Sequence, residues 1–446
     1  MVASGPQLEE DLMRERRRLA SKVPPAVVLA LALGGFLGAL LVAFAGPAAA
    51  APVLLHAEIA STSPHDGQRL QRPPQTLTIR FSEPVSLVED SLRVLRTDGG
   101  PSGRRVAVGA PRVTGAVVRW PVSLDLGKGS YLVSWRVVSD DGHPVAGAFS
   151  FGVAERVVPA ASGASGAAWS WPVAVARWLG DVAFSVVAGL LAFVLLCWPE
   201  GREDPRVRRL LLSGLVSGIV SSVLELLLQG PYGRGVASYR LLDRSLMTEV
   251  AQTSFGAWMQ LRVYLYVAMA AVLWLSGALG SVLNRWLAVL GTLALATTFS
   301  GTGHASSGAL PDRVALSVHV LTAGVWVGGL VTVVVLASGR DRRPGLSAFV
   351  RFSRLALAAV GVLLLSGVVN ALLRLDTVAQ LGTTGYGHLL LAKAVLVVAA
   401  LVPAAASRRL VRNGDLPLRE VRVEAVATTV VLALSAVLAL TSPHGP

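Results

Sequence analysis

The residues with the clearest potential for chemistry are Asp141-Gly142-His143-Pro144, in which a carboxylate and an imidazole lie two positions apart. In an extended backbone, positions i and i+2 point to the same side, so Asp141 and His143 can aim at one metal ion. Gly142 permits a tight path between them, and Pro144 stiffens the exit from the loop. The same residues are also common in ordinary turns. The motif therefore indicates a metal site only if further ligands come from elsewhere in the chain.

Histidine is rare in this chain, with seven in 446 residues, and its positions are therefore informative. His56 and His65 lie at the start of the region that ends with the Asp-Gly-His motif. His304 falls at the end of an apolar segment, and His319 lies a turn or two into the next one. We predict that these two imidazoles face each other near the extracytoplasmic ends of their segments and form the entry to a transport path. The alternative is that His304 lies at the membrane–water interface and that His319 forms a hydrogen bond with a neighbouring helix.

The composition is that of an integral membrane protein, because 53% of the residues are hydrophobic, 15% are charged and the mean hydropathy is +0.60. The formal charge of +13 does not indicate a nucleic-acid partner, since the arginines gather in short stretches between apolar runs. The partner that this composition predicts is the lipid bilayer. Cys197 is the single cysteine, which excludes an internal disulfide bond and a multi-cysteine metal site.

Changes in pattern along the chain predict four parts. Residues 1–51 are a cytoplasmic tail and a signal or anchor segment, whose apolar run is long enough to span a bilayer and ends in small residues that suit cleavage. Residues 56–153 alternate apolar and polar positions between Asp-Gly turns, which is typical of an antiparallel, immunoglobulin-like β-sandwich. Residues 154–170 are a linker rich in Ala, Ser and Gly, and residues 171–446 are an all-α membrane domain.

The membrane domain contains eight apolar segments, each near the roughly 20 residues that a spanning helix needs. They cover residues 172–198, 210–229, 257–281, 286–303, 314–338, 355–373, 388–407 and 424–441. Alternate connections are rich in arginine, and the positive-inside rule assigns these to the cytoplasm. We therefore predict a multi-pass protein of the plasma membrane, with the sandwich and the C-terminus on the extracytoplasmic side.

Ordered motifs across most of the chain resemble two copper-protein families. The sandwich region resembles the copper-binding domain CopC in His56-Ala57-Glu58, Ser63-Pro64-His65-Asp66-Gly67, Phe81-Ser82-Glu83-Pro84-Val85 and Ser139-Asp140-Asp141-Gly142-His143-Pro144-Val145-Ala146-Gly147. The membrane region resembles CopD in Gly303-His304, His319, Gly324-Val325-Trp326-Val327-Gly328-Gly329-Leu330, Arg351-Phe352-Ser353, Ser366-Gly367, Tyr386-Gly387, Leu391 and Lys393. The chain thus looks like a CopC–CopD fusion.

This resemblance implies a Cu(II) site formed by His56, Asp141 and His143. Imidazole and carboxylate ligands suit Cu(II). Residues 56–153 contain neither Met nor Cys, so the thioether Cu(I) site of some CopC relatives is missing here. In the family the ligand histidine is often the first mature residue, whereas Val53-Leu54-Leu55 precedes His56. His65 is an accessory candidate that could complete the site, although it is also a plausible solvated turn residue.

The resemblance also implies copper transport, in the direction of import, and copper homeostasis or resistance, with an extracytoplasmic copper chaperone as a partner. Two alternatives stay open: a factor that delivers copper to a membrane oxidase, and a redox protein that holds haem between histidines such as His304, His319 and His388. We do not expect an enzyme, because the sequence has neither a phosphate-cradling loop nor a Ser-His-Asp constellation with supporting context. Inside the bundle we expect two structural ion pairs, Glu225 with Arg262 and Asp181 with Lys393.

Overall fold

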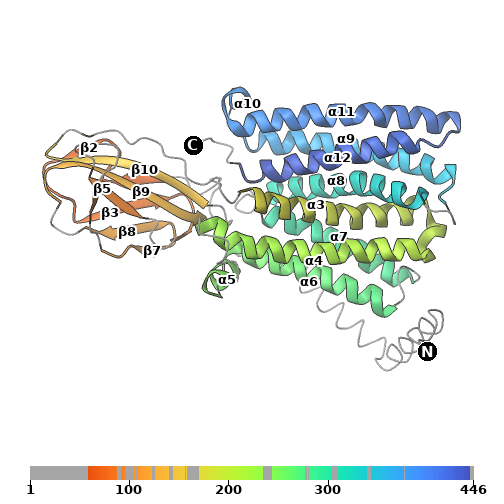
Figure 1. The fold of residues 1–446 in the computed structure, drawn as a ribbon, viewed down its shortest axis with the longest axis horizontal. Coiled ribbons are helices and arrows are strands. Elements are labelled where there is room, and N and C mark those ends of the chain that lie inside the picture. Colours follow the sequence, from red (N-terminus) through yellow and green to blue (C-terminus); the bar gives the residue numbers. More distant parts are fainter. Residues whose placement is uncertain are drawn as a thin grey trace, which may run out of the picture.

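The computed structural model consists of a β-sandwich at one end and a helical bundle at the other (Figure 1). It describes residues 59–87, 92–96, 104–106, 109–122, 126–139, 144–155, 157, 170–234, 244–276, 279, 281–302, 310–338, 343–375 and 377–441. The predicted signal or anchor segment, residues 1–51, lies outside these ranges.

The sandwich has two sheets, and all strand pairs are antiparallel except β2 with β10. The first sheet has the order β1 (Ile59–Ser63), β3 (Thr76–Phe81), β8 (Val117–Pro121), β7 (Arg112–Thr114). The second has the order β2 (Gln68–Leu70), β10 (Pro144–Val153), β9 (Gly129–Ser139), β5 (Arg93–Arg96), β6 (Arg104–Val106), with β4 (Val85–Leu87) also paired to β9.

The core of the sandwich follows from the period-two pattern of its strands. Leu77 and Ile79 of β3, and Val133 and Val137 of β9, are all at most 1% exposed, while their neighbours in sequence point outward. Alternate side chains of a strand point to opposite faces, so each sheet presents one apolar face to the other. The predicted sandwich is confirmed. Because its core is apolar, polar side chains lie mainly at its surface and in the loops at the ends of its strands.

The bundle contains eight helices that are long and apolar enough to cross a membrane, within the residues that the structure describes. They are α3 (Ser170–Ala192, continued by a π-helical turn, Phe193–Cys197), α4 (Pro205–Arg234), α6 (Ser254–Ser276), α7 (Val282–Gly301), α8 (Leu310–Ala337), α9 (Leu346–Leu372), α11 (Gly385–Asn413) and α12 (Leu418–Leu438). The short helices are the 3₁₀ turn Pro199–Glu203, α5 (Arg244–Ala251) and α10 (Gln380–Thr383). The predicted number of spans is confirmed.

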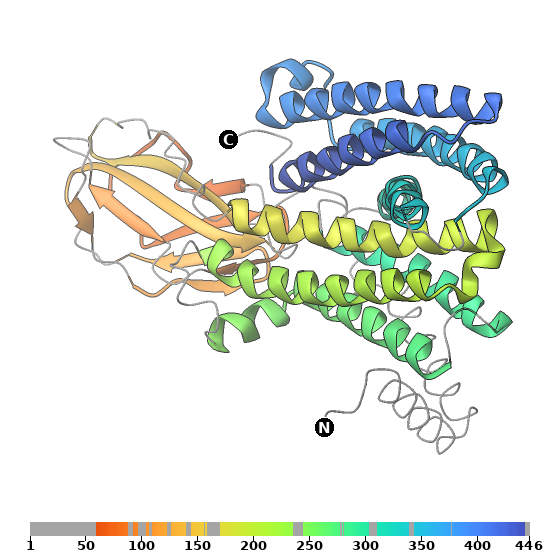
Figure 2. The same cartoon turned by 45° about the vertical axis from the view of Figure 1, so that its right-hand side comes forward.

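Helix α8 lies between α3, α9 and α12, as the turned view shows (Figure 2). It approaches α3 most closely at Gly328, where an added Cβ would lie 1.6 Å from the backbone oxygen of Ser185. Gly189 of α3 meets the Gly328 backbone in the same way, at 2.1 Å. Two glycines are needed here because any side chain would force these helices apart.

Several predicted segment limits were wrong at their polar ends. Helix α9 begins at Leu346 rather than at 355, and α12 begins at Leu418 rather than at 424. Arg351 and Glu424 therefore lie on helices and not in or beside connections. A hydropathy reading ends at the first charge, whereas a helix continues for as long as its backbone hydrogen bonds are satisfied and long arginine side chains reach the surface.

Candidate metal centre and transport path

The three predicted copper ligands, His56, Asp141 and His143, lie outside the described residues, as does His304 of the predicted path. The structure does describe the residues that flank the three ligands. Ile59 follows His56 by three positions, and Ser139 and Pro144 bracket the Asp-Gly-His motif. The geometry of the site is therefore read from these flanking residues.

Strand register brings the flanking residues to one end of the sandwich. Ile59, the first residue of β1, pairs with Phe81, the last residue of β3. Four residues later, Val85 of β4 pairs with Ser139, the last residue of β9. Pro144 begins β10 opposite Val138. Segments from distant parts of the chain thus start or end together here, and we call this part of the molecule the loop end of the sandwich.

A buried carboxyl group fixes the backbone at the loop end. The hydroxyl of Ser139 donates a hydrogen bond to Glu83 Oε1, and both side chains are at least nine-tenths buried. Glu83 follows β3, so this bond ties the connection between β3 and β4 to the strand that leads into the Asp-Gly-His motif. The sequence analysis quoted Glu83 within a motif but gave it no role. Its signal was an acidic residue placed directly after an apolar strand.

His65 lies elsewhere in the sandwich. It is exposed in the turn after β1, where its carbonyl accepts a hydrogen bond from Gln68 N and the next residue, Asp66, accepts one from Ser150 N at 2.8 Å. Ser150 lies six residues beyond Pro144 on β10, which corresponds to roughly 20 Å along a strand. The structure does not bring His65 toward the loop end. Among the described residues it also forms no group of three His, Cys, Asp or Glu side chains that could hold a metal ion.

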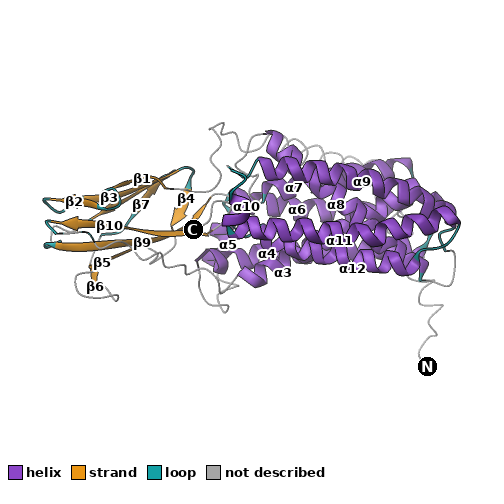
Figure 3. Cartoon of the chain, turned by 90° about the horizontal axis from the view of Figure 1, so that it is seen from above, coloured by secondary structure: helices purple, strands orange, loops and turns teal. Residues whose placement is uncertain are grey.

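The loop end faces the helices. Arg136 of β9, three residues before Ser139, donates a hydrogen bond of 3.0 Å from Nη2 to the carbonyl of Tyr232 in the last turn of α4. Strand β4 also lies at the side of the sandwich next to the bundle (Figure 3). Burial at this contact lowers the pKa of Arg136, while the neighbouring Tyr232 opposes the shift; the guanidinium stays charged at neutral pH.

His319 is half-buried among α8, α9 and α11. One ring nitrogen, Nδ1, lies 3.1 Å from the hydroxyl of Ser366, and the ring packs against Gly367, where an added Cβ would lie 3.3 Å from Cε1. Lys393 of α11 and Arg374 beyond the end of α9 are the charged groups that His319 faces. This imidazole does bond a neighbouring helix, and the predicted pairing with His304 lies outside the described residues.

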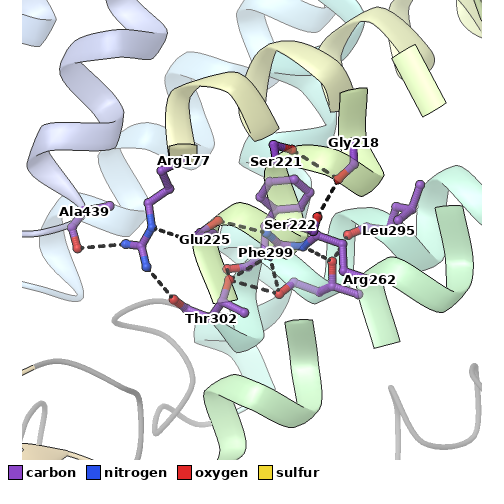
Figure 4. A network of polar contacts seen from close by, with 11 residues as sticks. Arg177, Gly218, Ser221, Ser222, Glu225, Arg262, Leu295, Phe299, Thr302 and Ala439 are labelled. Carbon is purple, nitrogen blue, oxygen red and sulfur yellow. Dashed lines mark hydrogen bonds and ion pairs between the residues drawn. The ribbon is translucent and has the colours of Figure 1, made fainter. Parts of the chain in front are cut away.

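Charged side chains meet inside the bundle, near the end that faces the sandwich. Glu225 of α4 accepts a hydrogen bond of 2.7 Å from Arg177 Nε and lies 3.8 Å from Arg262 Nη1, as the close view shows (Figure 4). The predicted pair of Glu225 with Arg262 is confirmed. Arg177 was missed, although it gave the same signal as Arg262, an arginine within an apolar run. The predicted pair of Asp181 with Lys393 is not a direct ion pair among the described residues, although Lys393 is one of the charged groups around Asp181.

The remaining donors of the two arginines reach the end of α7. Arg262 donates to the hydroxyl and the carbonyl of Thr298 and to the hydroxyl of Thr302, at 2.7 to 3.0 Å. Arg177 donates at 3.3 Å to the carbonyls of Thr302 and Ala439 (Figure 4). These bonds connect α3, α4, α6, α7 and the end of α12 into one brace. A guanidinium suits this role because its planar group carries five donors.

Comparison with known proteins finds three family matches that cover most of the described chain. Residues 59–154 match the CopC domain. Residues 167–311 match the N-terminal domain of proteins like copper resistance protein D, and residues 346–438 match copper resistance protein D.

Three relatives match different parts of the chain. The copper transport protein CutJ of Bacillus subtilis (strain 168) is 30% identical over 78% of this chain and 66% of CutJ. The inner membrane protein YebZ of Escherichia coli (strain K12) is 33% identical over 46% of this chain and 70% of YebZ. Copper resistance protein C of Xanthomonas campestris pv. juglandis is 32% identical over 24% of this chain and 85% of that protein.

Two solved structures resemble the sandwich. CopC from Methylosinus trichosporium OB3b is 24% identical, covers 24% of this chain and 99% of its own, and has a TM-score of 0.20. PcoC, a methionine-rich copper resistance protein from Escherichia coli, is 29% identical, covers 22% of this chain and 98% of its own, and has a TM-score of 0.19.

Proposed function

Because the chain belongs to the copper resistance proteins, as a CopC domain fused to a CopD-type membrane domain, we propose that its sandwich binds Cu(II) and its bundle imports copper. The domain matches and the eight candidate spans make it a copper-related, multi-pass membrane protein. The oxidation state, the ligands, the sidedness and the direction of transport are the parts that we propose. CutJ, whose name describes copper transport, supports the transport role.

The proposed Cu(II) ligands are His56, Asp141 and His143. The observation that carries this proposal is the convergence of their flanking residues at the loop end. A segment of three residues spans at most about 10 Å, so His56 is within that reach of Ile59. The Asp-Gly-His motif occupies the connection that closes β9 onto β10. Two imidazoles and a carboxylate are ligands that Cu(II) prefers.

The proposed path begins where the loop end meets the helices. Arg136 holds β9 against the end of α4, so copper released from the sandwich would enter beside the outer ends of the helices. His319 is the next imidazole along this path, and we include His304 as its partner. The proposal places the sandwich and the C-terminus outside the plasma membrane, where a copper chaperone could load the loop end.

The test measures copper binding and copper uptake with the same variants of the full chain. Purified protein in vesicles is titrated with Cu(II), and uptake into the vesicles is then followed by metal analysis. We expect the double variant His56→Ala, His143→Ala to lose high-affinity binding and uptake. We expect His319→Ala to bind Cu(II) as the unchanged protein does but to lose uptake.

His65→Ala is the matched control, because it removes an imidazole from the same domain but away from the loop end. It is expected to leave binding and uptake unchanged. Equal Cu(II) affinity in the double variant and the unchanged protein would overturn the ligand assignment. Binding without uptake by the unchanged protein would overturn transport and favour delivery of copper to another membrane protein.

A further inference from the structure

Three acidic side chains lie beyond the first turn of the membrane helices, in the residues that the structure describes, and they differ in their partners. Glu225 lies between Arg177 and Arg262 and is neutralised by them. Asp181 of α3 and Glu424 of α12 form no ion pair with any described residue. A carboxylate in a membrane bundle without a direct ion pair is costly, so its presence is by default a sign of function.

Asp181 lies in a polar part of the bundle, where its backbone carbonyl accepts a hydrogen bond from Ser185. Its carboxyl group forms no hydrogen bond with a described residue. The charged groups around it come from four helices and are Arg177 on α3, Glu225 on α4, Arg262 on α6 and Lys393 on α11. Helices α7, α8 and α12 also pack on α3, and none of their described side chains forms an ion pair with Asp181.

An unpartnered hydroxyl faces the same place. Tyr266 of α6 is 1% exposed, and its hydroxyl has no hydrogen-bond partner in the described part of the chain. Arg262 and Asp181 are the two ionisable groups whose charges act on this hydroxyl. A buried hydroxyl without a protein partner usually bonds an ordered water molecule.

Glu424 is more deeply enclosed, at 4% exposure. Its Oε1 accepts a hydrogen bond of 2.8 Å from the indole Nε1 of Trp326 on α8. The helices packed on α12 are α3, α8 and α11. Their ionisable groups in the described residues include Arg177, Asp181, His319, Lys393, Arg408 and Arg409. None of these pairs with Glu424, so a neutral indole is its partner.

The two unpaired carboxyl groups lie at successive depths. Helices α3 and α8 run in the same direction and touch at Gly189 and Gly328, so counting back nine residues on each places His319 level with Gly180, next to Asp181. Trp326 lies seven residues beyond His319, which is about 10 Å deeper along α8. Glu424 is therefore the inner carboxyl group and Asp181 the outer one.

We propose that copper movement through the bundle is coupled to proton movement, with Asp181 and Glu424 as the groups that take up and release the protons. This inference rests on the proposed copper transport. At each site the carboxyl O–H bond breaks as the proton passes to water or to the next acceptor, and it re-forms when a proton arrives. No electron is transferred. Movement of a proton balances part of the charge that copper carries across the bilayer.

The test uses the full chain in vesicles that enclose a pH-sensitive dye, with copper added outside. Asp181→Asn and Glu424→Gln remove the proton but keep the shape, and the amide oxygen of Gln can still accept from Trp326. We expect copper to change the internal pH with the unchanged protein, and this change to be lost in both variants together with most of the uptake. Cu(II) binding by the sandwich is expected to persist in both.

Two further variants distinguish the roles. Asp181→Glu and Glu424→Asp keep an ionisable group and are expected to retain part of the pH change, which a purely structural role would not require. Asp415→Asn, at an exposed position between α11 and α12, is the matched control and is expected to behave as the unchanged protein. Copper uptake without any pH change, or a full pH change in Asp181→Asn and Glu424→Gln, would overturn the coupling alone. Absence of uptake by the unchanged protein would overturn the proposed transport instead.

Discussion

The sandwich and the bundle bury opposite kinds of side chain. The sandwich core is a single cluster of aliphatic and aromatic residues, and Glu83 is its only buried charged residue among those described. The helical part buries several charged residues within its described ranges: Arg177, Asp204, Glu225, Arg262, Arg374 and Glu424. The sandwich thus keeps nearly all of its described charged groups at its surface, whereas the bundle keeps several in its interior.

This difference follows from the surroundings of each part. Water covers the sandwich, so polar groups stay at its surface and apolar burial drives its folding. Lipid covers the bundle, and exposed valines along α11, such as Val395, Val398 and Val402, face outward at no cost there. Helix association in lipid then relies on close packing and on polar contacts. The four predictions that follow test this contrast.

The largest expected effect comes from Glu225→Ala, which leaves Arg177 and Arg262 buried without their counter-charge. Removing one partner of a buried ion pair typically lowers the free energy of unfolding by about 3 to 5 kcal/mol. Denaturant unfolding in detergent micelles should show a destabilised bundle, while Cu(II) titration shows an intact sandwich. Arg209→Ala, at an exposed position in the first turns of α4, is the control. Equal stability of the two variants would contradict the brace.

Acid should weaken the sandwich site and leave the bundle intact. The proposed ligands His56 and His143 must be neutral to bind copper, and their reference pKa is about 6.5. As the pH falls below this value, protons compete at both imidazoles, and Cu(II) affinity should fall by up to roughly 100-fold per pH unit. Competition titrations at pH 7.5, 6.5 and 5.5 measure this. An affinity that does not change with pH would exclude imidazole ligation.

The next prediction concerns the close packing of helices in the bundle, at a glycine where α3 and α8 touch. Gly328→Ala drives a Cβ against the Ser185 carbonyl, and overpacking of this kind costs about 1 to 3 kcal/mol. Gly361→Ala on α9 is the matched control, because no atom lies within 4 Å of the added Cβ. Its stability should stay within about 1 kcal/mol of the unchanged protein. The same unfolding assay compares them, and a tolerated Gly328→Ala would mean that α3 and α8 can separate.

The smallest expected effect lies at the contact between the two parts. Arg136→Ala removes the bond to the Tyr232 carbonyl at the C-terminal end of α4, where a cation is worth about 1 kcal/mol. Hydrogen exchange should increase in the last turn of α4, with both cores unchanged. Arg119→Ala, exposed on β8, should produce no change there. Equal exchange in the two variants would show that the bond does not hold the parts together.

Local sequence patterns predicted the helices and strands better than they predicted the contacts between side chains. Alternation along β3 and β9 was sufficient for the sandwich, because each residue's face depends only on its position in the strand. Apolar length was sufficient for the eight spans. Helix ends were wrong where charges continue onto the helix, as at Arg351, and Glu424 was overlooked for this reason. The direct ion pair predicted for Asp181 did not form, because side-chain contacts depend on how closely neighbouring helices bring two residues together.

By itself, the sequence determined that an immunoglobulin-like domain precedes an eight-helix membrane domain, and its ordered motifs determined the copper-protein family. Those properties reside in short windows of the chain, where hydrophobic spacing and motif residues are read directly. Only the tertiary structure decided that the loop end faces the helices and that His65 lies at a distance from it. Only the tertiary structure, too, distinguished Glu225, which two arginines neutralise, from Asp181 and Glu424. The reason is that pairing and orientation arise from contacts between residues far apart in sequence, and no local pattern encodes them.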